Sequence, residues 1–172
     1  MTPEWSRPER VDTIGERERS IDISAAAEER AALARRFGLV GIDRLEASFA
    51  VRREAGSVVA TGRVAADITQ ACSITDEPLA VRIDEPVSLR FVEALDGEEE
   101  VELSEDALDT MPIEEGAIDL GEAAAETMAL ALDPFPRGPN AAAALKEAGV
   151  ISEDEVTPFN AFADLKAKLE KR

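Results

Sequence analysis

The chain has 172 residues, of which 45% are hydrophobic and 33% charged, and a formal net charge of −18, as expected for one soluble domain with a buried core. It has no histidine and one cysteine, which excludes histidine-dependent catalysis, histidine metal sites, an internal disulfide and a single-chain structural zinc site. No apolar run approaches the ~20 residues of a membrane span, and the N-terminus lacks the apolar stretch of a signal peptide, so we expect a cytoplasmic protein.

The negative charge is concentrated in the second half of the chain. Residues 1–75 carry 11 basic and 12 acidic side chains, whereas residues 76–172 carry 8 basic and 25 acidic ones. Between Glu93 and Glu126 there are 14 acidic residues and no lysine or arginine. Such a block repels the phosphate backbone of nucleic acids and attracts basic protein surfaces. Any direct contact with nucleic acid is therefore expected in the first half of the chain.

Residues 1–19 are predicted to form a partly ordered arm, because basic and acidic side chains alternate there without an apolar period. Val11 and Ile14 are suited to anchor a short edge strand, and Trp5 to pack on the body of the protein. The alternative is an arginine-bearing arm that binds RNA or protein.

A helix is predicted from Ser24, whose side-chain oxygen is a suitable N-cap, to Phe37. Gly38 fits the position after the helix end, where the left-handed conformation is common. The arginines of the last turn, Arg35 and Arg36, either complement the helix dipole or contact phosphate.

The segment from Leu45 to Val92 has a period of two, which predicts three long antiparallel strands with one buried and one solvated face. The first two strands join around Gly56, and the second and third join through residues 70–79, which contain the only cysteine. Pro86 removes a backbone donor and predicts a bulge or an edge position. The predicted fold class is α+β: an antiparallel sheet or a partly closed barrel of long hairpin strands, packed by N-terminal and C-terminal helices.

Residues 94–116 are predicted to form an acidic flexible loop, because they carry many like charges and little apolar surface to bury. The functional alternative is a docking segment that becomes ordered on a basic partner. Its candidate partner-binding residues are Glu98, Glu99, Glu100, Glu102, Glu105 and Asp106.

A helix over about residues 121–132 has a broad apolar surface, so we expect it to cross the core side of the sheet. Glu126 interrupts this surface, and it either pairs with an arginine of the sheet or lies at the margin. Asp133 precedes a proline and ends the helix. Residues 140–172 are predicted to form a helical tail of the single domain formed by residues 1–172.

Three segments of the chain carry a family resemblance. They are a strand that ends in Gln70-Ala71-Cys72 with Glu77-Pro78-Leu79 after it, the segment Ile118-Asp119-Leu120-Gly121-Glu122 followed by Glu126, and Asp133-Pro134-Phe135-Pro136-Arg137. In this order and spacing they resemble the YceD-like family of large ribosomal RNA subunit accumulation proteins, over roughly residues 10 to 172. The structural motif positions are Cys72, Pro78, Asp119, Leu120 and Glu126.

The chain resembles a cysteine-poor member of that family. Many members have a Cys-x-x-Cys pattern where Cys72 and Thr75 stand here, and further cysteines where Gly138 and Pro139 stand. A metal or redox role is therefore not carried over to this chain, and we expect no cofactor. Cys72 is interpreted as a small buried residue.

The resemblance implies a non-enzymatic ribosome-biogenesis factor that supports accumulation or processing of large-subunit (23S) ribosomal RNA. From the charge distribution we expect it to bind a basic ribosomal or assembly protein. Direct RNA contact is expected to be weak and to use Arg35, Arg36, Arg52 and Arg53. Neither a membrane nor a small-molecule substrate is an expected partner.

Two alternatives stay open. A general acidic chaperone-like or adaptor module would bind a basic protein without a specific role in ribosomal RNA. An enzyme that uses paired carboxylates would depend on the acids in ordered, partly apolar surroundings, which are Asp67, Asp76, Glu77 and Glu126. Nothing in the sequence places two of them across a cleft.

Overall fold

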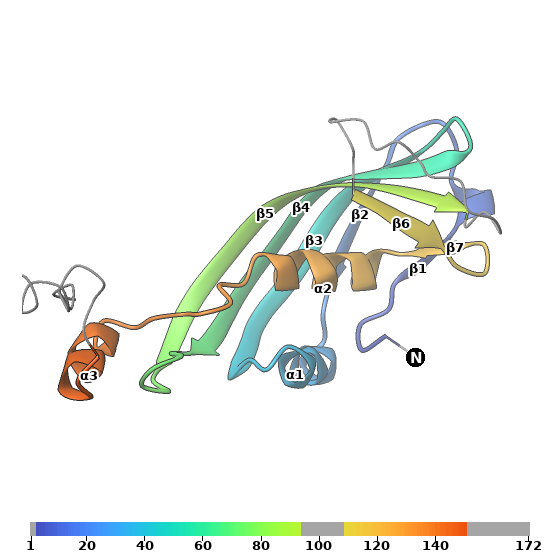
Figure 1. The fold of residues 1–172 in the computed structure, drawn as a ribbon. Helices are drawn as coiled ribbons and strands as arrows, with labels where there is room; N and C mark the ends of the chain where they lie inside the picture. The colour runs from blue at the N-terminus through green and yellow to red at the C-terminus, as the bar shows by residue number, and fades with distance from the viewer. Residues whose placement is uncertain (1–2, 94–108, 151–172) are drawn as a thin grey trace, which may run out of the picture.

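The computed structural model describes residues 3–93 and 109–150 of the chain. Its centre is a five-stranded sheet with the strand order β2-β3-β4-β5-β6 (Figure 1). Neighbouring strands are antiparallel, except that β5 and β6 are parallel. The strands are β2 (Arg19–Ser24), β3 (Gly41–Glu54), β4 (Ser57–Ala71), β5 (Pro78–Glu93) and β6 (Asp109–Ile113). A separate pair joins β1 (Pro8–Arg10) to β7 (Ala117–Asp119).

The three long strands predicted between Leu45 and Val92 are confirmed as β3, β4 and β5. Their alternation places Phe49, Val64 and Leu89 in the core, where each is at most 4% exposed. The opposite face carries charged residues in cross-strand ion pairs, among them Asp67 of β4, which accepts from an arginine of β3 and an arginine of β5. The period of two therefore reflects one dry and one wet face.

Pro86 does not interrupt β5. The pairing of β4 with β5 runs without a register shift through Arg63 and Pro86, so the predicted bulge is wrong. The predicted edge position is correct within the described residues, because β6 begins to pair with β5 only at Leu89. An edge strand tolerates proline since no neighbour requires the missing N–H donor there.

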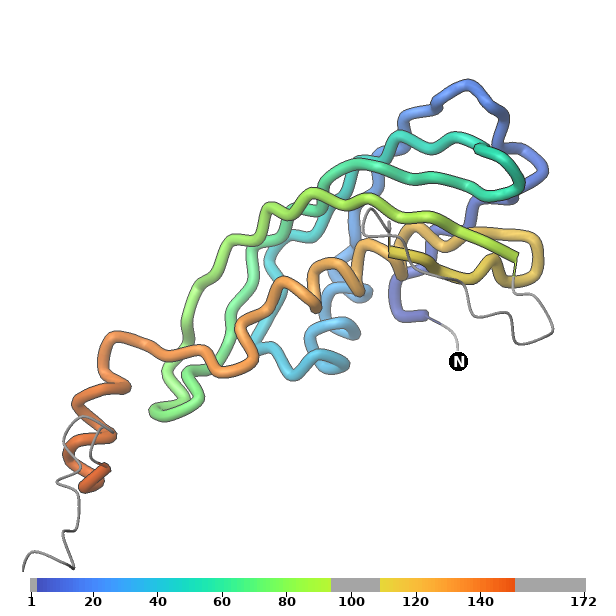
Figure 2. Tube along the Cα trace, turned by 45° about the horizontal axis from the view of Figure 1, so that its top comes forward, coloured from blue at the N-terminus to red at the C-terminus, as the bar shows by residue number. Residues whose placement is uncertain are grey.

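The sheet is open over residues 3–93 and 109–150, with β2 and β6 at its two edges. The alternative of a partly closed barrel is therefore wrong for this part of the chain, whereas the α+β class and the antiparallel sheet of long hairpin strands are confirmed. Closure would require β2 to pair with β6, but α1 and α2 instead cover the core face between them (Figures 1 and 2).

Helix α1 (Ala27–Arg36) begins later than predicted. Ser24 is the last residue of β2 and pairs with Glu46, so it is not the N-cap. Ala26 takes that position, and its backbone N–H donates to the Glu29 carboxylate at 2.7 Å. The predicted end is confirmed by Gly38, whose φ of +65° is left-handed.

Helix α2 (Leu120–Leu130) crosses the concave core side of the sheet, as predicted, and packs against β4 and β5 (Figure 2). Ala123, Ala124 and Met128 are at most 1% exposed. Leu130, which belongs to the predicted apolar surface, is instead 85% exposed. Asp133 accepts the N–H of Phe135 at 2.9 Å just after the helix.

The remaining predictions fall partly outside the described residues. Of the predicted flexible loop over residues 94–116, residues 94–108 lie outside the described part of the chain. The rest contains β6, because Met111 and Ile113 pack against the core. Of the predicted helical tail over 140–172, residues 151–172 lie outside, and the described part forms α3 (Ala141–Glu147). No helix within the described ranges is long and apolar enough to cross a membrane.

Candidate acidic groove

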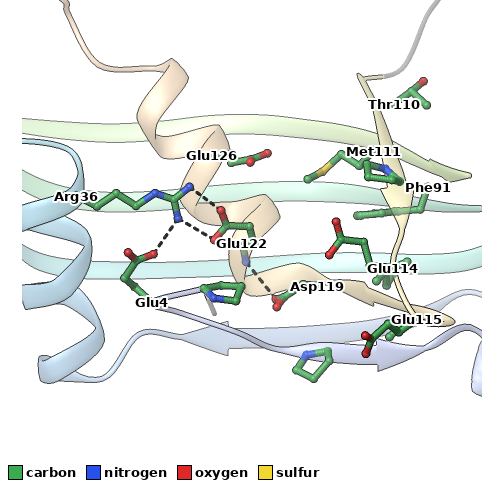
Figure 3. A pocket seen from close by; sticks show the side chains of 15 residues that line it. Glu4, Arg36, Phe91, Thr110, Met111, Glu114, Glu115, Asp119, Glu122 and Glu126 are labelled. Atoms are coloured by element: carbon green, nitrogen blue, oxygen red, sulfur yellow. Dashed lines mark hydrogen bonds and ion pairs between the residues drawn. The ribbon is translucent and has the colours of Figure 1, made fainter. Parts of the chain in front are cut away.

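An open groove of about 850 Å³ lies where the N-terminal segment, the end of α1, the end of β5, the β6–β7 region and α2 meet (Figure 3). Its lining holds six carboxylates and one guanidinium: Glu4, Glu114, Glu115, Asp119, Glu122, Glu126 and Arg36. Apolar side chains complete the lining, among them Phe91, Met111 and Ile118. Phe91 and Ile118 are each 1% exposed, so the groove has a firmly packed apolar floor.

Asp119 fixes the corner between β7 and α2. It is the N-cap of α2, and its Oδ1 accepts the N–H of Gly121 at 2.9 Å and of Glu122 at 3.2 Å. The same carboxylate accepts the backbone N–H of Arg7 at 2.8 Å and the hydroxyl of Ser6. One side chain therefore satisfies the first turn of the helix and ties the N-terminal segment to it.

Gly121 allows that segment to approach the helix closely. A Cβ atom at this position would lie 2.5 Å from the carbonyl oxygen of Trp5. Trp5 itself is fully buried in the core, as expected from the sequence. The Ile118–Glu122 motif thus caps α2 and packs it against the N-terminal segment, which positions the α2 wall of the groove.

Arg36 is held inside the groove by two carboxylates from distant parts of the chain. Its guanidinium donates to Glu122 at 2.7 and 3.0 Å and to Glu4 at 2.9 Å. These contacts, first of all the hydrogen bonds to Glu122, raise the pKa of Arg36. The pKa of Glu4 is lowered by its own backbone N–H and then by Arg36.

Glu126 lies one helix turn after Glu122 and faces the groove (Figure 3). Its side chain is exposed at the margin of the apolar surface of α2, and no arginine or lysine among the described residues pairs with it. Partial loss of water contact, followed by the nearby Glu122 charge, raises the pKa of Glu126. The marginal position is thus the correct one of its two predicted placements.

Glu114 and Glu115 belong to the turn between β6 and β7, where Glu115 has a φ of +50° and Gly116 one of +74°. Neither carboxylate has an ion pair or hydrogen bond with another described residue. Together with Glu126 they leave three carboxylates of the groove without an ion pair in the described part of the chain.

Cys72 and Pro78 lie elsewhere, at the corner between β4 and β5. Cys72 is fully buried, as predicted, and its Sγ accepts the N–H of Gly138 at 3.3 Å. This hydrogen bond, with a further contribution from the Thr75 hydroxyl, lowers the pKa of Cys72 to about 7. Pro78 pairs with Ala71 at the start of β5. The family motif therefore divides into this corner and the groove, which Asp119 and Glu126 line, whereas Leu120 is fully buried in the core.

The six acids proposed for partner binding, Glu98 to Asp106, lie outside the described residues. Of the proposed RNA contacts, Arg36 lies in the groove and Arg52 is near Glu18 and Glu54, at 3.6 and 3.3 Å. Arg53 donates to the carbonyl of Val11, and the Arg35 side chain is exposed.

Of the four acids considered for an enzyme, Asp67, Asp76, Glu77 and Glu126, only Glu126 lines the groove. Asp67 lies on the wet face of the sheet between two arginines, whereas Glu126 lines the groove on the other side. Glu77 accepts from Thr75 and Asn140 at the corner near Cys72. No three cysteine, aspartate or glutamate side chains in the described ranges are placed to hold one metal ion.

Sequence reasoning missed Glu4, Glu114, Glu115 and Glu122 as site residues. The excess of acids between Glu93 and Glu126 pointed to the right part of the chain. It did not identify which acids meet, because Glu4 and Arg36 reach the groove only through the fold.

Comparison with known proteins identifies one family. Residues 60–167, more than half of the chain, match the family described as Large ribosomal RNA subunit accumulation protein YceD. The matched region includes α2 and the β6–β7 part of the groove, as well as the corner around Cys72. No curated protein and no solved structure matches the chain.

Proposed function

The chain belongs to the YceD family, and we propose that it is a non-enzymatic ribosome-biogenesis factor that supports accumulation of large-subunit (23S) ribosomal RNA in the cytoplasm. The family match carries this proposal, because its description names a role in accumulation of the large ribosomal RNA subunit. The fold and the groove bear on how such a role is performed.

The proposed mode of action is binding of a basic ribosomal or assembly protein rather than direct recognition of RNA. A net charge of −18 disfavours contact with a phosphate backbone, whose binding depends on lysine and arginine. The groove also favours a basic protein partner over RNA, since its lining has six carboxylates and a single guanidinium. Many ribosomal proteins are strongly basic because they pack against RNA, and an acidic surface is complementary to them.

Direct RNA contact through Arg35, Arg36, Arg52 and Arg53 is the weaker mode within this proposal. A phosphate bound by Arg36 would have to replace Glu4 and Glu122, which already hold its guanidinium. Arg35, on the same helix turn, is exposed and is the better placed of the two.

The decisive experiment compares ribosomal RNA in cells with and without the gene. We expect a selective loss of mature large-subunit RNA, with small-subunit RNA maintained and recovery when the gene is restored. Equal levels of both RNAs in the two strains would contradict the proposal.

The second candidate is a general acidic chaperone-like or adaptor module for basic proteins. The unpaired carboxylates Glu114, Glu115 and Glu126 favour a basic partner without specifying a ribosomal one. Under this alternative, deletion leaves the ratio of the two ribosomal RNAs unchanged and instead increases aggregation of basic proteins, which fractionation of the lysate measures.

A further inference from the structure

We propose that the acidic groove binds an extended segment of a basic protein that combines arginine or lysine with an apolar side chain. The cation would lie against Glu126 and Glu114, and the apolar side chain against Met111 and Pro112. This inference rests on the proposed function, for which it names the chemistry of the partner and the site that receives it.

The groove already holds one guanidinium of its own. Arg36 is bound by Glu122 and Glu4 at distances of 2.7 to 3.0 Å. Short charge-assisted contacts of this kind are the ordinary way in which carboxylates recognise arginine. The same wall of α2 then continues to Glu126, which is near the Arg36 charge but forms no ion pair or hydrogen bond with another described residue.

Further carboxylates come from a second wall. Glu114 and Glu115 project from the turn between β6 and β7, with Met111 and Phe91 nearby, while Glu122 and Glu126 project from α2 (Figure 3). These four carboxylates, together with Glu4 and Asp119, share the groove with one guanidinium. A bound cation would offset the repulsion between Glu126 and Glu122, which raises the pKa of Glu126 after the loss of water contact.

The apolar part of the lining favours a protein segment over a simple cation. Pro8 and Pro112 are exposed and Met111 is partly exposed in the groove, above the buried Phe91. A polyamine or a metal ion would use the carboxylates and leave this surface in water. A segment with an apolar residue next to a cation uses both parts of the lining.

The test uses the purified full chain and a labelled eight-residue peptide that contains two arginines and two leucines, with binding measured by fluorescence anisotropy. Two matched peptides replace arginine by uncharged citrulline, or leucine by serine. We expect both replacements to weaken binding, the first by roughly tenfold or more.

Two protein variants locate the site. Glu114→Gln combined with Glu126→Gln should weaken binding by roughly tenfold. Asp43→Asn combined with Glu85→Gln removes the same charge from exposed positions outside the groove and should leave binding within about twofold of wild type. As a measurement that needs no variant, the NMR signal of the Met111 methyl group should shift on titration with the arginine–leucine peptide.

Three results would overturn the inference. The first is equal binding of the arginine–leucine peptide by the two protein variants, and the second is undiminished binding of the citrulline peptide. The third is a serine peptide that binds as tightly as the leucine peptide and is displaced by spermidine. None of these depends on ribosomal RNA. A loss of large-subunit RNA in the deletion strain, together with absent peptide binding, would remove this inference and leave the proposed function intact.

Discussion

Asp119 accepts more hydrogen bonds than any other carboxylate in the groove, so its loss should lower stability. It accepts hydrogen bonds from the N–H groups of Arg7, Gly121 and Glu122 and from the Ser6 hydroxyl. We predict that Asp119→Ala lowers the free energy of unfolding by about 2–3 kcal/mol, because a helix cap is lost and buried donors are left unpaired.

Urea denaturation measures this change. The matched control is Asp84→Ala, which removes an exposed carboxylate paired with Arg63 and should cost about 1 kcal/mol or less. Similar losses for both variants would show that Asp119 acts only as a surface charge.

Cys72 provides a residue-scale prediction about pH. Its pKa is lowered from 9.0 to about 7, first by the Gly138 N–H. The thiolate absorbance of the folded protein should therefore titrate about two pH units below that of the unfolded chain. Because the folded pKa is the lower one, the associated stability is complete above the unfolded pKa and is lost as the pH falls through about 7.

Ultraviolet titration with and without denaturant checks the Cys72 prediction, and Cys72→Ser is the control that removes the signal. A folded midpoint close to that of the unfolded chain would contradict the assigned hydrogen bond from Gly138. Cys72→Ala should also lower stability by about 1–2 kcal/mol, since the Gly138 donor loses its acceptor.

Helix α2 contains two glutamates, Glu122 and Glu126, whose negative charges repel each other. Glu122 and Glu126 are four residues apart on the same helix face, and the pKa of Glu126 is raised by partial loss of water contact and then by the Glu122 charge. We predict that Glu126→Gln stabilises the protein at neutral pH by a few tenths of a kcal/mol. The folded pKa of Glu126 is the higher one, so wild type loses stability as the pH rises through it, and the difference between the two proteins disappears below about pH 4.

Thermal melts at several pH values measure the effect of Glu126→Gln. Glu28→Gln, in the first turn of α1, is the control, because a carboxylate there is favoured by the helix dipole and its neutralisation should not stabilise. A pH-independent gain for Glu126→Gln would indicate altered packing instead of charge.

Elements with a strong local pattern were predictable from the sequence. The period of two identified β3, β4 and β5, and the apolar surface of α2 identified its place against the sheet. Pro86 was a weaker signal, because the same missing donor suits either a bulge or an edge. The prediction of Ser24 as the N-cap of α1 was wrong because serine is also accepted in a strand. Ser24 is the last residue of β2, where it pairs with Glu46.

The groove was beyond reach of local patterns because its walls are far apart in the chain. Glu4 and Glu122 meet only because Arg36 on α1 lies between them. The Asp119 motif signalled an important position, but its sequence did not distinguish a capping role from a binding role. Such assignments depend on topology, which composition and periodicity leave open.

At the scale of the whole molecule, charge should govern partner capture. We predict that neutralising the six acids from Glu98 to Asp106 with Gln or Asn weakens capture of basic ribosomal proteins and reduces the dependence of binding on salt concentration. Substitution is used because a deletion of residues 96–111 would also remove Asp109, Thr110 and Met111 of β6.

Affinity capture at two matched salt concentrations measures this effect. The control neutralises six exposed acids that have no ion pair with another described residue: Glu16, Asp22, Glu28, Asp43, Asp76 and Glu85. If both sextuple variants lose capture equally, total charge and not the acidic block is responsible. If neither loses it, the docking role of residues 98–106 is removed.

The groove has a thermodynamic consequence that follows from its construction. Its walls come from the N-terminal segment, α1, β5, the β6–β7 region and α2, so the unfolded chain has no equivalent site. A partner that binds only the folded state stabilises it, by about 2.7 kcal/mol when the free partner is at 100 times its dissociation constant. Occupancy of the groove would then protect the protein from proteolysis, and its cellular abundance would rise and fall with the supply of unassembled basic partner.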